Sequence, residues 1–287
     1  MNIISDLPPT VISPIVEFAL SEDFGVSGDL TAKLLIPENA TGSLVMRARE
    51  SGIISGFQAA AMTYDKVDPR VIFEPQIPEG AVVDRGTIIA KLNGPSRSLL
   101  SAERVALNFL GRLSGIASLT RKYVDRVKGT NVRIAATRKT TPGLRALEKQ
   151  AVLAGGGYTH RESLAAAIMI KDNHIALAGG VDAALTAIKA KADHMARVSV
   201  EVDTLEQLKI VLTYEPDVVL LDNMGPKKLK DAVAIVDSAS YRRPILEASG
   251  GVNLETVSDI AKSGIDVISI GALTHSAPNF DIGMDDV

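Results

Sequence analysis

The chain has 287 residues, which is enough for one large domain or two ordinary ones and for a core that needs no disulfides. It contains no cysteine, so thiolate catalysis, cysteine-ligated zinc and iron–sulfur clusters are excluded. Aromatic residues make up only 4% and the net charge is −3, which argues against base-stacking platforms and against a general basic surface for nucleic acid or anionic membranes.

Targeting patterns are missing from the sequence as well. The first basic residue is Lys33, so the N-terminus lacks the basic region of a secretory signal. The apolar runs are all far shorter than the ~20 residues of a membrane span. We therefore expect a cytoplasmic protein with neither nucleic-acid nor membrane partners.

The first 110 residues mix helical and strand patterns. The expected elements are a helix over 12–20, a strand over 42–49, two short strands within 80–95 and helical structure over 99–127. Gly111 and Gly115 in the last segment indicate either two helices or one helix with a break.

After Gly129 short β-branched runs alternate with amphipathic helical stretches. The expected strands are 132–136, 166–170, 198–202, 218–221, 245–248 and 267–270. The expected helices are 142–153, 181–192, 204–212, 226–238 and 253–262. This alternation predicts parallel strands in an open doubly wound sheet or in a barrel, and the change of pattern near residues 110–130 predicts two domains.

Residues able to do chemistry follow nearly every predicted strand. An open sheet concentrates its site at one switch point, whereas a barrel gathers all its strand ends around one site. We therefore favour a barrel, and one with fewer than eight strands because only six are convincing.

A basic cluster stands at these strand ends. Arg138 and Lys139 follow the first strand of the second domain, and Lys171 follows the next. A solvated helix face explains Arg145 and Lys149, but cations focused into one cleft are costly unless an anion binds there. These residues predict a ligand rich in phosphates or carboxylates.

Acidic and glycine-rich positions complete the pattern. Glu201 and Asp222 end consecutive strands, where they can hold Mg²⁺ or sugar hydroxyls, or pair with the basic residues. The segment 249–251 (Ser-Gly-Gly) and Gly271 match the phosphate site that barrels often build from their last two loops, although 249–251 can also be an ordinary tight turn. His160 gains interest from its neighbour Arg161, whereas 155–157 (Gly-Gly-Gly) is interpreted as a helix end and loop.

Several segments in register resemble one family, the quinolinate phosphoribosyltransferases. They are 103–110 (Glu-Arg-x-x-Leu-Asn-Phe-Leu), 113–117, 137–145 (Thr-Arg-Lys-Thr-Thr-Pro-Gly-Leu-Arg), 155–161, 170–174, 221–224, 247–251 and 271–276. The likeness runs from about Glu22 to Asp281 in the family's order, with small departures at Ser118 and Tyr158.

The resemblance implies an N-terminal α/β sandwich over 1–112 and an incomplete (β/α) barrel over 113–274, with a tail over 275–287 that returns to the first domain. It also implies the reaction of quinolinate with phosphoribosyl pyrophosphate to give nicotinate mononucleotide, pyrophosphate and CO₂ in NAD synthesis, with Mg²⁺. Family members are dimers or larger assemblies, and the resemblance implies that Arg104 reaches the active site of the neighbouring subunit.

The resemblance also assigns roles to individual residues. Those expected at the quinolinate carboxylates are Arg104, Arg138, His160 and Arg161. Lys139 and Lys171 are expected between the ring and the pyrophosphate, as catalytic and substrate-binding groups. Glu201 and Asp222 are expected at the ribose hydroxyls and Mg²⁺, and Ser249, Gly250 and Gly271 at the 5′-phosphate.

Three other functions stay open at this point. One is a paralogue on the same fold that acts on another base, such as the ModD-type protein linked to molybdenum transport. A second is a Schiff-base aldolase, because Lys139 or Lys171 at a strand end can be an amine nucleophile. The third is a phosphosugar-binding or scaffold protein without catalysis.

Overall fold

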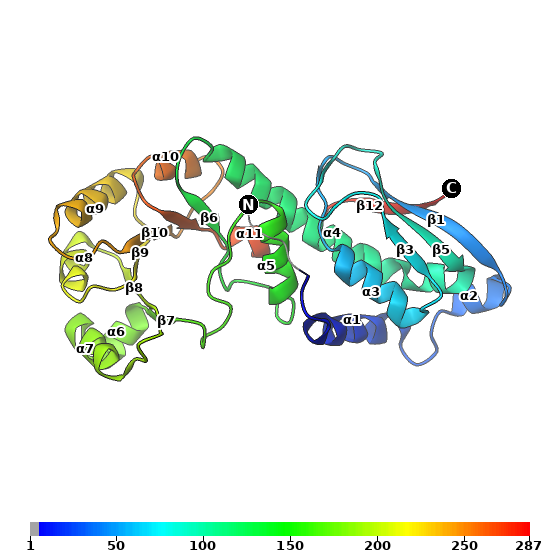
Figure 1. Ribbon diagram of the computed structural model, residues 1–287, viewed down its shortest axis with the longest axis horizontal. Coiled ribbons are helices and arrows are strands. Elements are labelled where there is room, and N and C mark those ends of the chain that lie inside the picture. Colours follow the sequence, from blue (N-terminus) through cyan, green and yellow to red (C-terminus); the bar gives the residue numbers. More distant parts are fainter. Residues whose placement is uncertain (1–5) are drawn as a thin grey trace. The chain divides into compact units, whose positions relative to one another are not determined.

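The computed structural model describes residues 6–287, which divide into two compact units (Figure 1). The first contains the chain up to Arg121 together with Thr140–Gly156 and Leu273–Val287. The second contains Lys122–Lys139 and Gly157–Ala272. Among the described residues no helix is long and apolar enough to cross a membrane.

The first unit is built on a four-stranded antiparallel sheet. Its strands, in spatial order, are β12 (Ile282–Asp286), β1 (Thr41–Ala48), β5 (Ile88–Pro95) and β3 (Ile72–Pro75). β12 comes from the C-terminal tail and pairs with β1 through Ala48 and Ile282. A separate two-stranded ribbon joins β2 (Gly52–Ile53) to β4 (Val82–Val83).

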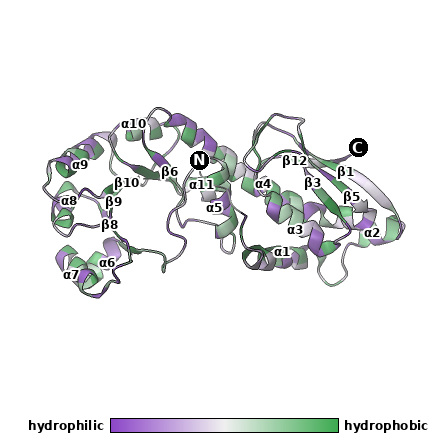
Figure 2. Ribbon diagram, viewed as in Figure 1, coloured by the Kyte–Doolittle hydropathy of each residue, from purple (hydrophilic) through white to green (hydrophobic). Residues whose placement is uncertain are grey.

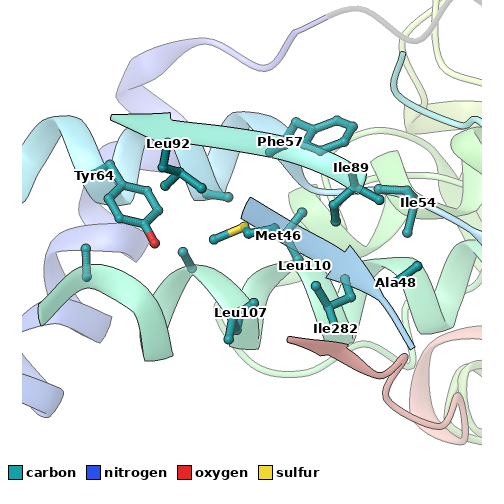
Figure 3. Close-up of a cluster of buried hydrophobic side chains, with 14 of the residues drawn as sticks. Met46, Ala48, Ile54, Phe57, Tyr64, Ile89, Leu92, Leu107, Leu110 and Ile282 are labelled. Atoms are coloured by element: carbon teal, nitrogen blue, oxygen red, sulfur yellow. The ribbon is translucent and has the colours of Figure 1, made fainter. Parts of the chain in front are cut away.

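Two helices, α3 (Phe57–Val67) and α4 (Ser96–Arg126), pack on this sheet to form the first core. The unit also contains α1 (Pro9–Phe24), α2 (Leu30–Leu35) and α5 (Arg145–Ala154). Figure 3 shows the cluster between β1, β5 and α4, with Met46, Leu92 and Leu110 fully buried. Removal of these apolar side chains from water is the main driving force for folding of the unit.

The segment predicted as two helices, or one with a break, forms the single helix α4. Its two glycines are explained by close packing of the tail: a Cβ on Gly115 would lie 1.9 Å from the carbonyl oxygen of Pro278, and one on Gly111 would lie 3.0 Å from that of Phe280. They therefore make room for another segment and do not end the helix. The domain boundary expected at residues 112–113 falls inside α4, and the division there stays a prediction.

The second unit contains a six-stranded parallel sheet. Its strands, in spatial order, are β6 (Arg133–Ala135), β11 (Val267–Ser269), β10 (Ile245–Ser249), β9 (Val218–Asp222), β8 (Val198–Val202) and β7 (Ile168–Ile170). The sheet is curved, and α8 and α9 lie on its outer side (Figure 1). The carboxyl ends of its strands meet on one edge because neighbouring strands pair in parallel throughout the sheet.

Short connections and helices link these strands. The helices are α6 (Asp172–Ala178), α7 (Val181–Lys191), α8 (Leu205–Leu212), α9 (Pro226–Ser238) and α10 (Val257–Ala261). The short helix α11 (Ala272–His275) comes after the last of these strands and, apart from Ala272, belongs to the first unit. Helix α9 buries Leu229, Ala232 and Val236 at helical spacing, and Figure 2 shows both hydrophobic and hydrophilic colours along it.

Most elements of the second unit lie where the sequence predicts them, but one helix was missed. α6 starts directly after Lys171, in a stretch interpreted only as a strand end. Its N-terminus is held by a local bond in which the backbone N–H of Lys171 donates to Nδ1 of His174 at 2.9 Å. None of its residues is buried, so its sequence does not need the apolar residues at helical spacing from which a helix is predicted.

Candidate active site

The register of the parallel sheet brings the predicted site residues to one edge. Ile170 pairs with Val200, which sets Lys171 beside Glu201 at the ends of β7 and β8. Asp222 pairs with Ser249 across β9 and β10. The ends of β7 and β8 thus carry the cation of Lys171 beside the carboxylate of Glu201, and those of β9 and β10 carry the carboxylate of Asp222 beside the hydroxyl of Ser249.

An ion pair joins the first two of these residues. Lys171 Nζ lies 2.5 Å from Oε2 of Glu201, whose side chain is only 10% exposed. Burying a carboxylate is expensive unless a charged donor compensates it. Lys171 provides that compensation for Glu201.

Asp222 lies close to several charges in this group. Burial raises the pKa of its carboxyl, and the negative charges of Glu201 and Asp203 raise it further. Lys171 and Lys139 act in the opposite direction. The carboxylates here therefore repel one another in part, and a cationic partner would relieve that repulsion.

A second group at this edge is cationic. Burial, together with the nearby charge of Arg138, lowers the pKa of the Arg161 guanidinium. Arg161 is also anchored, because its Nη1 donates to the carbonyl oxygen of Ala167 at 2.9 Å. Two guanidinium groups whose charges act on one another offer donors that suit a carboxylate or phosphate.

His160 is held from both sides of its ring. Its Nδ1 accepts a hydrogen bond from the backbone N–H of Arg161 at 2.8 Å, and its Nε2 lies 3.3 Å from Oε2 of Glu247. The buried Glu247 carboxylate fixes the orientation of the ring next to Arg161. Its other oxygen, Oε1, is buried and has no hydrogen-bond partner among the described residues.

The turn after β10 approaches the backbone of the neighbouring loop. Gly250 has φ +87°, a conformation that glycine adopts without steric cost. Ser249 is the last residue of β10 and Gly271 comes shortly after β11, so both stand at the same edge as Asp222. Backbone N–H groups at such positions are the kind that can approach a phosphate.

Two further predicted residues are exposed. Lys139 is exposed and follows β6, within electrostatic range of Asp222. Arg104 lies in the first unit, on an exposed face of α4. The triple glycine begins at Gly155, which caps the end of α5.

Sequence reasoning missed two residues at this edge, Glu247 and Asn223. Glu247 stands inside the buried apolar strand β10, and a charged residue in such a run was the available signal. Asn223 has φ +53° directly after β9, which the sequence does not reveal.

Comparison with known proteins identifies the family of this arrangement. The model of the N-terminal domain of quinolinate phosphoribosyl transferase matches residues 29–114, and the model of its C-terminal domain matches residues 116–285. The chain belongs to the quinolinate phosphoribosyltransferase family. The resemblance expected from the sequence motifs is thereby confirmed.

Individual relatives agree with the family models. The chain is 42% identical to the nicotinate-nucleotide pyrophosphorylase [carboxylating] of Mycobacterium leprae, an alignment that covers 93% of this chain and 94% of that protein. It is 40% identical to the probable nicotinate-nucleotide pyrophosphorylase [carboxylating] of Bacillus subtilis, over 92% of this chain and 89% of the relative.

Solved structures support the fold. The crystal structure of the nicotinate-nucleotide pyrophosphorylase of Ehrlichia chaffeensis superposes with a TM-score of 0.90 at 37% identity, and the alignment covers 95% of this chain and 97% of that one. The predicted fold class, an N-terminal α/β domain followed by an incomplete α/β barrel, is confirmed.

Proposed function

We propose that this chain is an enzyme that transfers the phosphoribosyl group of phosphoribosyl pyrophosphate to quinolinate. The products are nicotinate mononucleotide, pyrophosphate and CO₂, which places the reaction in NAD biosynthesis. The family membership supports this activity, and the observation that carries it is the division of one sheet edge into a guanidinium pair and a lysine–carboxylate cluster.

The charges of that edge suit the two substrates. Quinolinate carries two carboxylates, for which Arg138 and Arg161 offer bidentate donors, with His160 beside them. Lys139 and Lys171 stand on the side of Glu201 and Asp222, where they can stabilise a pyrophosphate. Ser249, Gly250 and Gly271 are proposed for the 5′-phosphate.

Magnesium fits the acidic part of the site as a proposed cofactor. Glu201 and Asp222 provide hard oxygen donors, and the raised pKa of Asp222 reflects negative charge that a cation would offset. No group of three or more acidic or histidine side chains with metal-site geometry occurs in residues 6–287. Glu201 and Asp222 are the residues that would hold the ion, and one or two protein carboxylates are commonly enough for Mg²⁺. Bound Mg²⁺ would neutralise charge on the leaving pyrophosphate.

The protein's share of the chemistry is electrostatic. As the bond from C1 of the ribose to pyrophosphate breaks, positive charge develops on the ribose, and the carboxylates of Glu201 and Asp222 face it. Lys139 and Lys171 stabilise the negative leaving group. The ring nitrogen of quinolinate then bonds to C1 and becomes cationic. That cation accepts the electron pair released when the adjacent carboxylate leaves as CO₂, and a proton replaces the carboxylate.

We further propose that a second copy of the chain completes each site through Arg104. Arg104 is exposed on α4, and Leu100 on the same face is 39% exposed. The neighbouring helix α2, tied to α4 by the Asp29–Ser101 hydrogen bond of 2.9 Å, leaves Leu34 87% exposed. Exposed apolar side chains of this kind favour a partner, and an identical subunit would bring Arg104 with it.

A Schiff-base aldolase that uses Lys171 as its nucleophile is disfavoured by one contact. Lys171 is paired with Glu201, which stabilises the ammonium form, whereas the nucleophile of a Schiff-base enzyme must be a neutral amine. The cytoplasmic location expected from the sequence stays a prediction.

Substrate selection provides the test of this function against a same-fold paralogue. The purified chain should form mononucleotide from quinolinate and phosphoribosyl pyrophosphate, and much less from nicotinate, which lacks one of the two carboxylates. Equal turnover with nicotinate, or turnover only with a base that has no carboxylate, would assign the chain to a different transferase.

A further inference from the structure

Asn223 holds an unusual backbone conformation at the centre of the site edge. It directly follows Asp222 and has φ +53°. Among residues 6–287 only Glu215 shares a positive φ without being glycine. Asparagine tolerates this left-handed region better than most residues, because its short polar side chain bonds locally.

The contacts of Asn223 join two loops. Its side-chain Nδ2 donates to Oδ2 of Asp222 at 2.6 Å, and its backbone N–H donates to the carbonyl oxygen of Ser249 at 2.8 Å. One residue is therefore bonded to the carboxylate at the end of β9 and to the turn after β10.

Gly250 fits against the same side chain. A Cβ at Gly250 would lie 2.1 Å from Oδ1 of Asn223 and 3.0 Å from its backbone nitrogen, so a larger residue cannot occupy that position without displacing Asn223. The left-handed turn at Asn223 and the glycine at 250 are thus two parts of one packing arrangement.

We infer that Asn223 is a positioning residue for phosphoribosyl pyrophosphate. It fixes the distance between the Asp222 carboxylate, at the ribose end, and the Ser249–Gly250 turn, at the 5′-phosphate end. The inference rests on the proposed function. It adds a residue that acts through Asp222 and the Ser249–Gly250 turn and not by direct contact with the substrate. Preorganisation of this kind lowers the cost of ordering two loops when the substrate binds.

The first test is the variant Asn223→Gly. Glycine accepts φ +53° without strain, so the backbone and the thermal midpoint should stay close to those of the wild type. The side-chain bond to Asp222 and the packing on Gly250 are lost. We expect the Kd and KM of phosphoribosyl pyrophosphate to rise about tenfold, the size expected for one hydrogen bond to a charged group. The KM of quinolinate should change less than about twofold.

The variant Asn223→Asp removes the Nδ2 hydrogen-bond donor but keeps the size of the side chain. Aspartate keeps the size and the tolerance of a left-handed backbone, but its carboxylate faces that of Asp222. This variant should bind phosphoribosyl pyrophosphate more weakly than Asn223→Gly does. Equal or tighter binding would overturn the role given to the Nδ2 donor.

A double-mutant cycle tests the packing on Gly250. Gly250→Ala should weaken phosphoribosyl pyrophosphate binding strongly, and part of that loss should disappear when Asn223→Gly removes the atom that meets the new methyl group. Independent effects would refute the coupling between the two loops.

Two results would overturn the inference as a whole. One is wild-type affinity for phosphoribosyl pyrophosphate in Asn223→Gly, measured by isothermal titration calorimetry. The other is an equal loss for both substrates with a lowered thermal midpoint, which would mark a purely structural role. A wild type that binds phosphoribosyl pyrophosphate but turns over no quinolinate would refute the proposed function alone, because the calorimetric comparison stands without turnover. A wild type that binds none would refute both.

Discussion

Lys171 Nζ and Glu201 Oε2 lie 2.5 Å apart at the ends of two adjacent parallel strands. The pair neutralises the largely buried carboxylate while keeping the ammonium group at the sheet edge. It also means that the cation proposed for the leaving group is oriented before any substrate arrives. In many enzymes, preorganised charge of this kind contributes more to the rate enhancement than any other single effect.

Removal of the Lys171 ammonium should therefore affect chemistry more than folding. We expect Lys171→Met to lower kcat by about 100-fold, the range seen when one preorganised donor is removed from an active site. The thermal midpoint should also fall, because the 10% exposed Glu201 carboxylate loses the cation that compensates its burial, but the chain should stay folded because Lys171 itself is 44% exposed. Steady-state kinetics with both substrates measures the effect, and Lys189→Met on the exposed surface of α7 provides the control. Full activity in Lys171→Met would exclude Lys171 from the reaction.

The sequence predicted the six parallel strands and their order of appearance because each is a short β-branched run between amphipathic helices. It also placed Lys171, Glu201 and Asp222 at strand ends, since a charged residue that follows such a run marks where the strand leaves the core. The contacts between side chains could not be predicted from the sequence. The contact between His160 and Glu247 joins positions far apart in the chain, and it depends on a strand register that no local pattern encodes.

Contacts between distant parts of the chain also explain why the sequence suggested a break in α4 and gave no sign of the backbone conformation of Asn223. Gly111 and Gly115 resembled helix breakers because their function is tertiary: they accept the tail residues Pro278 and Phe280. Asn223 gave no signal because a left-handed backbone depends on the neighbouring Ser249 carbonyl and on Gly250.

A buried ion pair stabilises the first unit. Arg112 donates to Oε1 of the fully buried Glu148 at 2.8 Å and to carbonyl oxygens of Thr274 and Ala277, while Glu148 Oε2 accepts from the backbone of Thr141. Arg112→Met leaves that carboxylate without its cation, and the free energy of unfolding should fall by about 3 kcal/mol.

Urea denaturation of Arg112→Met measures this loss, with the exposed Arg85→Met as control. A double variant, Arg112→Met with Glu148→Leu, should recover part of the stability because no buried charge remains. An unchanged urea midpoint in the single variant would show that Glu148 is stabilised by its other donors.

Asp68 gives the first unit a pH dependence. Hydrogen bonds from Arg70 and Ser98 hold the pKa of its carboxyl well below the ordinary range. A folded-state pKa below the unfolded value contributes stability that is present above the unfolded pKa of about 4, and that is lost as the pH falls through the folded value.

The wild type should therefore lose stability below about pH 4 more steeply than Asp68→Asn, which cannot titrate at this position. Above that pH, Asp68→Asn should be the less stable of the two. Thermal midpoints measured at intervals between about pH 2.5 and about pH 7 test both statements, with the exposed Asp65→Asn on the preceding helix α3 as control. Parallel curves for the wild type and Asp68→Asn would contradict the assignment.

The proposed sharing of Arg104 between subunits predicts complementation. Arg104→Ala and Lys139→Ala should each be nearly inactive, since one lacks a carboxylate ligand and the other a leaving-group cation. When the two variants are unfolded together and refolded as hybrids, one site in each hybrid dimer regains both residues. Recovery of activity toward half of the wild-type value in the hybrid dimer, once it is separated from the two homodimers, supports the shared site. Hybrids purified by two different tags that stay inactive would show that Arg104 acts within its own chain or not at all.

The coupling of glycosyl transfer to decarboxylation is the central feature of the proposed reaction, and a product balance tests it most directly. The purified chain is supplied with quinolinate, phosphoribosyl pyrophosphate and Mg²⁺, and nicotinate mononucleotide, pyrophosphate and CO₂ are measured in the same reaction. We predict that the three products appear together in equal amounts and that all three stop when either substrate is omitted. Release of CO₂ without nucleotide, or of pyrophosphate without CO₂, would contradict this coupling.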